Sequence, residues 1–324
     1  MSSTHSAPDP TSDGPPGGLR RIPDRPDHLI DIGDAATIAM HELAGDIAAP
    51  PLLVCHATGF NAWTYRQFAA HLGARWRVIG IDLRGHGASS TPDLAEDADG
   101  RVPGLAWPRF ADDVLIALDA LDIVGAVGVG HSCGGATLLM AEAARPGTFS
   151  ALWAYEPVIF PPDWGAGRID AEGQPVNPLA EGARRRRASF ASRAAVFERF
   201  AARPPLSWWE PAVLADYVTS GFVDDPAPDE GEPDRVRLAC SPAAEAATFD
   251  QAASSQAAQH LDAVSCPTTI ACGGERADFG EPIARWVADQ LPAGRHEVFP
   301  ELSHFGPFEA AKRIAEAIER AIPV

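Results

Sequence analysis

The stretch Gly130-His131-Ser132-Cys133-Gly134 decides the fold predicted for this chain of 324 residues. It follows an apolar, strand-like run, Ala126–Val129, and precedes a helical pattern, Ala136–Ala144. A strand that turns sharply into a helix strains the backbone of the middle residue, and glycine on each side lets the two elements approach closely. We therefore expect the Ser132 hydroxyl to project from a strand end, beside the free N–H groups of a helix N-terminus.

Two phosphate-binding interpretations of this glycine-rich turn fail on residue identity. In the Walker pattern a lysine must reach the phosphates, but Ala136 holds that position and Lys312 is the only lysine of the chain. A dinucleotide-binding loop would need its third glycine where Cys133 stands. The turn is therefore expected to expose a serine, and no cofactor is expected.

Short apolar runs alternate with helical patterns along the chain. Leu52–Cys55 and Val78–Ile81 are apolar without alternation, as expected for strands buried on both faces of a parallel sheet. The repeated alternation predicts an α/β fold with a doubly wound, mostly parallel sheet and helices on both faces. The predicted strands are Ala36–Leu43, Pro51–Cys55, Arg77–Ile81, Ala126–Val129, Ala151–Tyr155, Pro267–Ala271 and His296–Phe299. The predicted helices of this core are Trp63–Leu72, Phe110–Leu121, Ala136–Ala144 and Pro307–Ile322.

The alternation divides the chain into three parts. Residues 1–27 are dense in Pro, Ser, Gly and Asp, and are predicted to be a disordered arm. Residues 28–157 and 259–324 form the predicted core. Residues 158–258 form a predicted helical cap, with helical patterns at Ala183–Arg203 and Pro211–Gly221. Because four consecutive residues point around a helix, the run Arg184–Arg187 is predicted to lie on a solvated face.

Composition excludes several kinds of partner. The chain has 44 acidic and 26 basic residues, a formal net charge of −18, which argues against binding nucleic acid or anionic lipid. No apolar stretch approaches the roughly 18 residues of a membrane helix. Five cysteines without paired spacing predict neither a disulfide framework nor a zinc site, and favour the cytoplasm. We expect a small-molecule substrate and leave a homodimer open.

From about residue 36 to the C-terminus, the chain resembles the α/β-hydrolase superfamily. In that family the turn at Ser132 is the nucleophile elbow. Further segments are similar to the family's oxyanion loop, its DxRGxGxS segment, its acid loop and its histidine loop. The oxyanion loop is matched by His56-Ala57-Thr58-Gly59-Phe60, with Ala57 in place of the usual glycine. The DxRGxGxS segment is matched by Asp82–Ser89, the acid loop by Gly274–Asp278 and the histidine loop by Ser303–Glu309.

A catalytic serine needs a base to deprotonate it and an acid to hold that base in the right tautomer, in the chain order serine, acid, histidine. Asp278 and His304 satisfy that order after Ser132, and all three are expected at the carboxyl ends of strands. Glu156 also follows a predicted strand, but Pro157 just after it suggests a turn. We therefore predict Ser132, Asp278 and His304 as the catalytic residues, with Glu156 lining the pocket as the alternative acid.

The resemblance also implies an oxyanion hole and a covered substrate pocket. The backbone N–H groups of Thr58 and Cys133 are the expected oxyanion donors, with Phe60 as the second choice for the first of them. Trp208 and Trp209 are expected to contact an apolar substrate together with Phe60, although the same aromatic residues could instead pack the cap's own core.

These residues predict a serine hydrolase that cleaves a carboxylic ester through an acyl-serine intermediate, without a metal. A carbon–carbon bond hydrolase, a lactone hydrolase or a cofactor-free perhydrolase could use the same triad. Serine at the elbow argues against an epoxide hydrolase or a haloalkane dehalogenase. A chain that resembled those enzymes would carry an acidic nucleophile at this position. A non-catalytic receptor on the same fold is the alternative from another class.

Overall fold

The computed structural model describes residues 25–33, 35–98, 100–162, 168–169, 175–225, 234–252, 255–274 and 280–322. Most of the predicted N-terminal arm and the predicted acid Asp278 lie outside these ranges.

Eight strands of the described residues form one sheet, in the order β1-β2-β4-β3-β5-β6-β12-β13. From β4 to β13 in that order all neighbours are parallel, whereas β2 is antiparallel to both of its neighbours. The predicted doubly wound, mostly parallel sheet is therefore confirmed. The strands are β1 His28–Asp31, β2 Thr37–Ala44, β3 Pro51–Cys55, β4 Arg77–Asp82, β5 Ala126–His131, β6 Phe149–Tyr155, β12 Thr268–Gly273 and β13 Gly294–Phe299.

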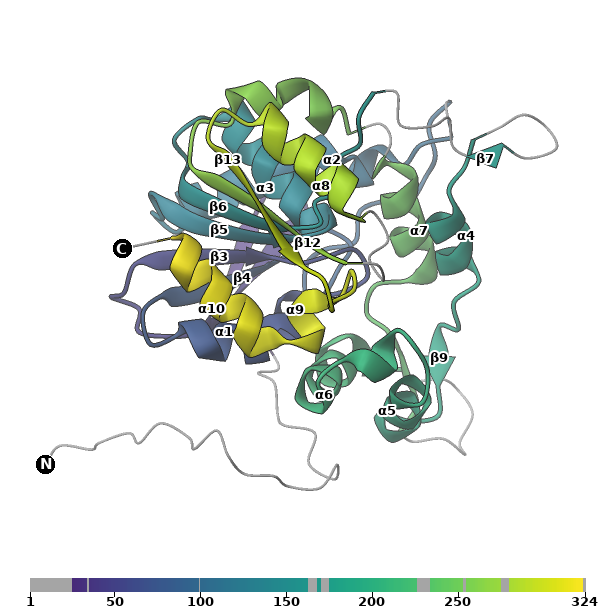
Figure 1. Ribbon diagram of the computed structural model, residues 1–324. Coiled ribbons are helices and arrows are strands. Elements are labelled where there is room, and N and C mark those ends of the chain that lie inside the picture. Colours follow the sequence, from purple (N-terminus) through teal and green to yellow (C-terminus); the bar gives the residue numbers. More distant parts are fainter. Residues whose placement is uncertain are drawn as a thin grey trace, which may run out of the picture.

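Helices cover both faces of this sheet, as Figure 1 shows. Leu52 and Val54 of β3 share a hydrophobic cluster with Phe68 of α1, whereas Leu53 shares a second cluster with Phe110 of α2. Successive side chains of a strand point to opposite faces, so a strand covered on both sides must be apolar at every position. The helices of the core are α1 Arg66–Leu72, α2 Trp107–Ala120, α3 Cys133–Ala144, α8 Gly280–Gln290, α9 Gly306–Glu309 and α10 Ala311–Ala321.

Several features of the core differ from the sequence prediction. The single helix predicted at Pro307–Ile322 is broken at Ala310 into α9 and α10, and the helix predicted at Trp63–Leu72 begins as a 3-10 turn. Strand β1 was not predicted, because it is a four-residue edge strand in which only Ile30 is buried. Helix α2 begins at Trp107 instead of Phe110, since proline at its second position suits a first helical turn. Asp113, in the second turn of this longer helix, is buried, and its Oδ2 accepts a hydrogen bond of 2.6 Å from Nε of Arg84.

The predicted cap region, between β6 and β12, contains helices and a small sheet that lie beside one end of the central sheet (Figure 1). The single helical pattern predicted at Ala183–Arg203 was wrong. Ser192 caps a new helix by accepting a hydrogen bond of 3.2 Å from the N–H of Ala195, and β9 precedes it. The cap limits at residues 158 and 258 stay a prediction. The elements are α4 Pro178–Arg184, β9 Ser189–Phe190, α5 Arg193–Ala201, α6 Pro211–Ser220, β10 Phe222–Asp224, β11 Val236–Leu238 and α7 Pro242–Asp250.

Short elements complete the described chain. They are η1 Ala62–Tyr65, η2 Pro103–Leu105, η3 Leu206–Trp208, η5 Ala257–Ala263, β7 Arg168–Ile169 and β8 Pro175–Val176. All five cysteines are free and buried. Within the described ranges, no helix has the length and apolar character needed to cross a membrane.

Candidate active site

Ser132 occupies the strained turn that the flanking glycines predicted. Its φ of 56° and ψ of −119° lie outside the regions that side-chain-bearing residues normally adopt. A Cβ at Gly134 would lie 2.2 Å from the carbonyl oxygen of Cys55, and a Cβ at Gly130 would lie 2.5 Å from Cα of Gly135. Only glycine fits at these two positions, so β5 and α3 can approach closely and hold Ser132 at the strand end.

His304 is paired with a carboxylate. Its Nδ1 lies 2.7 Å from Oε2 of Glu156, and Oε1 of Glu156 accepts a hydrogen bond of 2.8 Å from the N–H of Gly273. Both side chains are buried. When Nδ1 of His304 donates to Glu156, Nε2 keeps its lone pair and can accept a proton.

The alternative acid of the sequence analysis therefore holds the position expected of Asp278. Glu156 has a φ of 43°, and its N–H donates to the carbonyl oxygen of Ala271 in β12, at 2.8 Å. The turn that Pro157 suggested does occur, but it directs the Glu156 side chain toward β12 and His304 instead of away from the site. Asp278 lies outside the described residues, so its part in the site stays a prediction.

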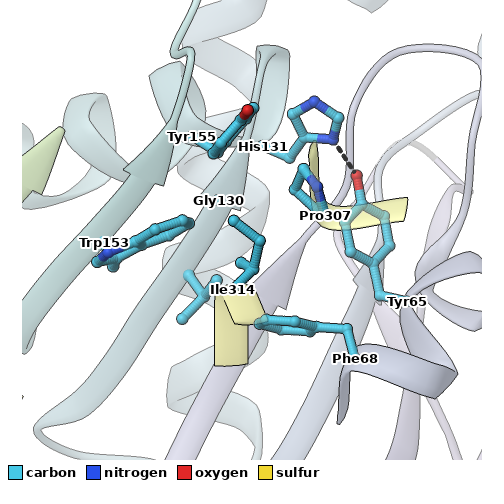
Figure 2. A pocket seen from close by; sticks show the side chains of 9 residues that line it. Tyr65, Phe68, Gly130, His131, Trp153, Tyr155, Pro307 and Ile314 are labelled. Carbon is cyan, nitrogen blue, oxygen red and sulfur yellow. Dashed lines mark hydrogen bonds between the residues drawn. The ribbon is translucent and has the colours of Figure 1, made fainter. Parts of the chain in front are cut away.

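His131, which precedes the serine, links two loops of the site. Its Nε2 lies 2.8 Å from the carbonyl oxygen of His304, and its Nδ1 lies 2.7 Å from the hydroxyl of Tyr65 (Figure 2). The Tyr65 hydroxyl in turn accepts a hydrogen bond of 3.1 Å from the N–H of Ala57. Burial, and then repulsion from His304, hold the pKa of His131 well below its ordinary value. A neutral His131 accepts from Tyr65 and donates to His304, which fixes the backbone of the histidine loop.

A small pocket beneath His131 lies between the sheet and helices α1 and α10 (Figure 2). Its apolar walls keep the surroundings of His131 poor in water, which agrees with the lowered pKa of that ring. It is lined by Tyr65, Phe68, Val129, Gly130, His131, Trp153, Tyr155, Pro307 and Ile314.

The predicted oxyanion donors lie on two segments, Thr58 in the loop after β3 and Cys133 at the start of α3. Cys133 is the first residue of α3, where a backbone N–H has no partner within the helix. Burial raises the pKa of the Cys133 thiol to about 12, although a hydrogen bond with the Thr58 side chain acts to lower it. The N–H of Phe60, the second choice of donor, is bonded to the carbonyl oxygen of Ala57 at 3.2 Å. Thr58 therefore remains the better candidate.

His56 fixes the shape of the same loop. Its Nε2 accepts a hydrogen bond of 2.9 Å from the N–H of Leu83, and its Nδ1 lies 2.8 Å from the carbonyl oxygen of Ala57. Burial, and then repulsion from His86, lower the pKa of His56 to about 3. Both contacts are those of a neutral ring that braces backbone. Within the described part of the chain, no group of three or more His, Cys, Asp or Glu side chains is placed to hold a metal ion.

The predicted substrate-binding aromatic residues separate in the structure. Phe60 contacts Trp209, with ring centroids 5.4 Å apart, and Phe305, at 6.2 Å. Trp209 is 4% exposed and lies 4.5 Å from the Phe308 ring, whereas Trp208 is 40% exposed. Phe60, in the oxyanion loop, and Trp209 therefore lie against Phe305 of the histidine loop, whereas Trp208 lies at the surface. Substrate contact by these residues stays a prediction.

One arginine of the cap, Arg186, has contacts near the site that its sequence pattern did not predict. Helix α4 ends at Arg184, and Arg186 beyond it leaves the solvated face that was predicted for the whole run. Its Nη1 donates to both carboxylate oxygens of Glu245, at 2.6 and 2.5 Å, and its Nη2 donates to the hydroxyl of Tyr217 at 3.0 Å. No local periodicity marks Arg186, because its direction depends on where α4 ends.

A model described as "Alpha/beta hydrolase family" matches residues 52–317, which include every described residue of the site. The chain belongs to this family.

This α/β hydrolase is similar to proteins of different named activities. It is 36% identical to an epoxide hydrolase of Caballeronia sordidicola over 33% of this chain and 30% of that protein. It is 32% identical to 3-oxoadipate enol-lactonase 2 of Acinetobacter baylyi over 34% of this chain and 38% of that protein. The chain thus matches about a third of the length of these relatives.

The fold as a whole is similar to solved structures. The crystal structure of E-2-(acetamidomethylene)succinate hydrolase superposes on this α/β hydrolase with a TM-score of 0.70. That likeness covers 92% of this chain and 98% of the other, at 22% sequence identity, and so it supports the fold alone.

Proposed function

We propose that this α/β hydrolase cleaves a carboxylic ester through an acyl intermediate on Ser132. The observation that carries the proposal is the buried pair of His304 and Glu156 at the strand ends beside the strained serine. His304 follows β13, and its ring lies 4.9 Å from that of His131, the neighbour of Ser132 in sequence. A nucleophile, a base and an orienting acid in this arrangement are what acyl transfer needs.

The proposed reaction proceeds in two halves. Ser132 Oγ attacks the ester carbonyl carbon while Nε2 of His304 takes the serine proton, and Glu156 stabilises the resulting imidazolium. The N–H groups of Thr58 and Cys133 hold the carbonyl oxygen as it becomes negative. His304 then gives its proton to the departing alcohol. In the second half, water attacks the acyl carbonyl carbon while His304 takes a proton from the water, and His304 then returns a proton to Ser132 Oγ as the carboxylic acid leaves. These steps require no cofactor.

Glu156 takes the role of orienting acid in this proposal. The bond of Oε1 to the N–H of Gly273 fixes the carboxylate so that Oε2 faces Nδ1 of His304. A buried carboxylate held by a backbone donor keeps the imidazole in the tautomer that accepts a proton at Nε2. The ring of Phe60 and its aromatic neighbours support an ester that is partly apolar.

Lactones are the second candidate substrates. A lactone is a cyclic ester, so the same serine, histidine and carboxylate would open it, and one of the relatives is named an enol-lactonase. The epoxide hydrolase similarity carries less weight, since the residue at this elbow is Ser132 and not an acid.

Turnover of p-nitrophenyl esters of increasing acyl length, together with a set of simple lactones, tests the proposal. We expect hydrolysis by the wild type and a loss of up to about 10⁶-fold in Ser132→Ala, without a change in melting temperature. Mass spectrometry of the quenched wild type should show one acyl group on the peptide that contains Ser132. Undiminished turnover by the folded variant would overturn the nucleophile assignment, and failure of the wild type on every ester and lactone would favour a binding protein.

A further inference from the structure

The loop that supplies the proposed first oxyanion donor lies against an ion pair of the cap. Gly59, the residue after Thr58, has a φ of 81°. A Cβ at Gly59 would lie 2.5 Å from Oε1 of Glu245 and 3.4 Å from Nη1 of Arg186. The carboxylate of α7 therefore touches the loop backbone next to the place where negative charge develops in the proposed reaction.

Three cap elements converge on this loop through one arginine. Arg186, which follows α4, binds both oxygens of Glu245 in α7 and the hydroxyl of Tyr217 in α6. The Tyr217 ring packs on Phe60, with centroids 5.2 Å apart. The side chain of Glu245 is 7% exposed, so water screens its charge poorly. We name Arg186, Glu245 and Tyr217 the cap clamp.

A buried carboxylate beside an oxyanion hole opposes catalysis, because it repels the negative charge of the transition state. A guanidinium bonded to both of its oxygens cancels most of that repulsion at close range. The same guanidinium also holds the oxyanion loop in place, because its partner Glu245 contacts Gly59 and its partner Tyr217 contacts Phe60. Arg186 therefore affects both the electrostatic field at the oxyanion hole and the position of the loop that supplies its first donor.

We propose that Arg186 is a positioning residue that neutralises Glu245 and ties the cap to the oxyanion loop, so that the oxyanion hole is complete only with the cap docked. This inference rests on the proposed function of Ser132. It assigns Arg186 to a neutralised pair instead of to direct capture of a substrate anion, because Nη1 is already bonded to Glu245 and Nη2 to the Tyr217 hydroxyl.

The test combines kinetics with hydrogen exchange. Arg186→Gln, Glu245→Gln and the double variant are compared on p-nitrophenyl acetate, with Arg184→Gln and Arg185→Gln as matched controls from the same arginine run. Arg185 is paired with Glu181, and Arg184 with Glu181 and with Asp250 at the far end of α7, all at the surface. Arg186→Gln should lower kcat by about 10- to 100-fold with KM nearly constant, less than the loss of a whole oxyanion donor.

The double variant separates charge from architecture. If the uncompensated carboxylate causes the loss, Glu245→Gln should cost less than Arg186→Gln, and the double variant should recover most of the kcat that Arg186→Gln loses. Hydrogen exchange in the peptide that contains residues 56–61 should be faster in Arg186→Gln than in either control. Should Arg186→Gln fail to fold, Arg186→Lys carries the test, because it keeps the charge but cannot span Glu245 and Tyr217 together. Arg186→Lys should then lower kcat severalfold and speed the same exchange.

Three results would overturn the cap clamp. They are a double variant no better than Arg186→Gln, exchange at residues 56–61 equal to that of the controls, and a rise in KM confined to carboxylate-bearing esters. The last of these would assign Arg186 to substrate binding. Hydrolysis retained by Ser132→Ala would instead overturn the proposed function, and the exchange measurement would still judge the loop contact separately.

Discussion

At the scale of single residues, the site depends on which carboxylate meets His304. Asp278 has the more familiar place in the chain order, yet Glu156 is the described carboxylate in contact with Nδ1. Its position follows from the turn after β6, where a positive φ directs the side chain along the sheet edge toward β12. A carboxylate bound on both oxygens is rigid, which suits an orienting role.

Replacing this carboxylate should impair turnover more than it impairs folding. Glu156→Gln should lower kcat by about 10⁴-fold, because an amide no longer favours the tautomer with its proton on Nδ1. Asp278→Asn is the matched comparison and should cost far less. Steady-state kinetics of both purified variants on one ester checks the ranking, and the reverse order would return the role to Asp278.

A second residue-scale prediction concerns stability at low pH. The pKa of His56 falls from 6.5 to about 3 on folding. Between those two pH values the unfolded chain binds a proton at His56 that the folded chain does not, so the free energy of unfolding decreases as the pH falls through this window. His56 alone contributes a slope of about 1.4 kcal/mol per pH unit there.

Urea unfolding of His56→Gln at about pH 6 and about pH 5 measures that contribution, because glutamine can still donate to Ala57 and accept from Leu83. The free energy of unfolding of the variant should depend on pH less steeply than that of the wild type, by about 1.4 kcal/mol per pH unit. His71→Gln, at an exposed position of α1, is the control and should leave the slope as it is. An equal slope in His56→Gln and wild type would mean that His56 is not neutral in the folded chain.

At the scale of elements, the contact between α3 and β3 is set by one glycine. A Cβ at Gly134 would overlap the backbone of Cys55, and backbone cannot move aside as a flexible side chain can. The first turn of α3 is therefore held at a distance that only glycine permits, and this distance positions both Ser132 and the N–H of Cys133.

Gly134→Ala should destabilise the fold by about 1–3 kcal/mol or more, because the added methyl group overpacks the strand-to-helix turn. Gly182→Ala in α4 is the contrasting variant, since nothing lies within 4 Å of its added Cβ. There the better helix propensity of alanine should raise stability by about 0.5–1 kcal/mol. Thermal and urea unfolding of the two variants measure the difference, and a stable Gly134→Ala would refute the close approach.

At the scale of the whole molecule, the cap is fastened to the core by both polar and apolar contacts. The N–H of Glu210 donates to the carbonyl oxygen of Phe308, and Oε1 of Glu210 accepts from the N–H of Ala311, each at 2.9 Å. Asp216 of α6 accepts from Nε2 of Gln67 in α1 at 2.7 Å. Between these bonds Trp209 fills the interface.

Trp209→Ala should therefore lower the free energy of unfolding by about 3–5 kcal/mol, as expected for a large buried ring. The neighbouring Trp208→Ala should cost only about 0.5–1 kcal/mol, because that ring is partly exposed. Denaturant unfolding of both variants measures the two costs, and acyl-chain preference is recorded in parallel. Equal, small costs with a changed chain preference for Trp209→Ala would assign this ring to the substrate instead of to the interface.

The sequence by itself determined the sheet, the elbow and the candidate base, because these depend on local patterns. Strands buried on both faces are apolar at every position, and a strained turn requires its glycines next to Ser132. Only the tertiary structure decided that Glu156 meets His304 and that Arg186 meets Glu245. Those contacts join segments far apart in the chain, and their side-chain directions depend on where β6 and α4 end. When the end of a strand or helix moves by one residue, the side chains that follow point in a different direction, and no local pattern records that change.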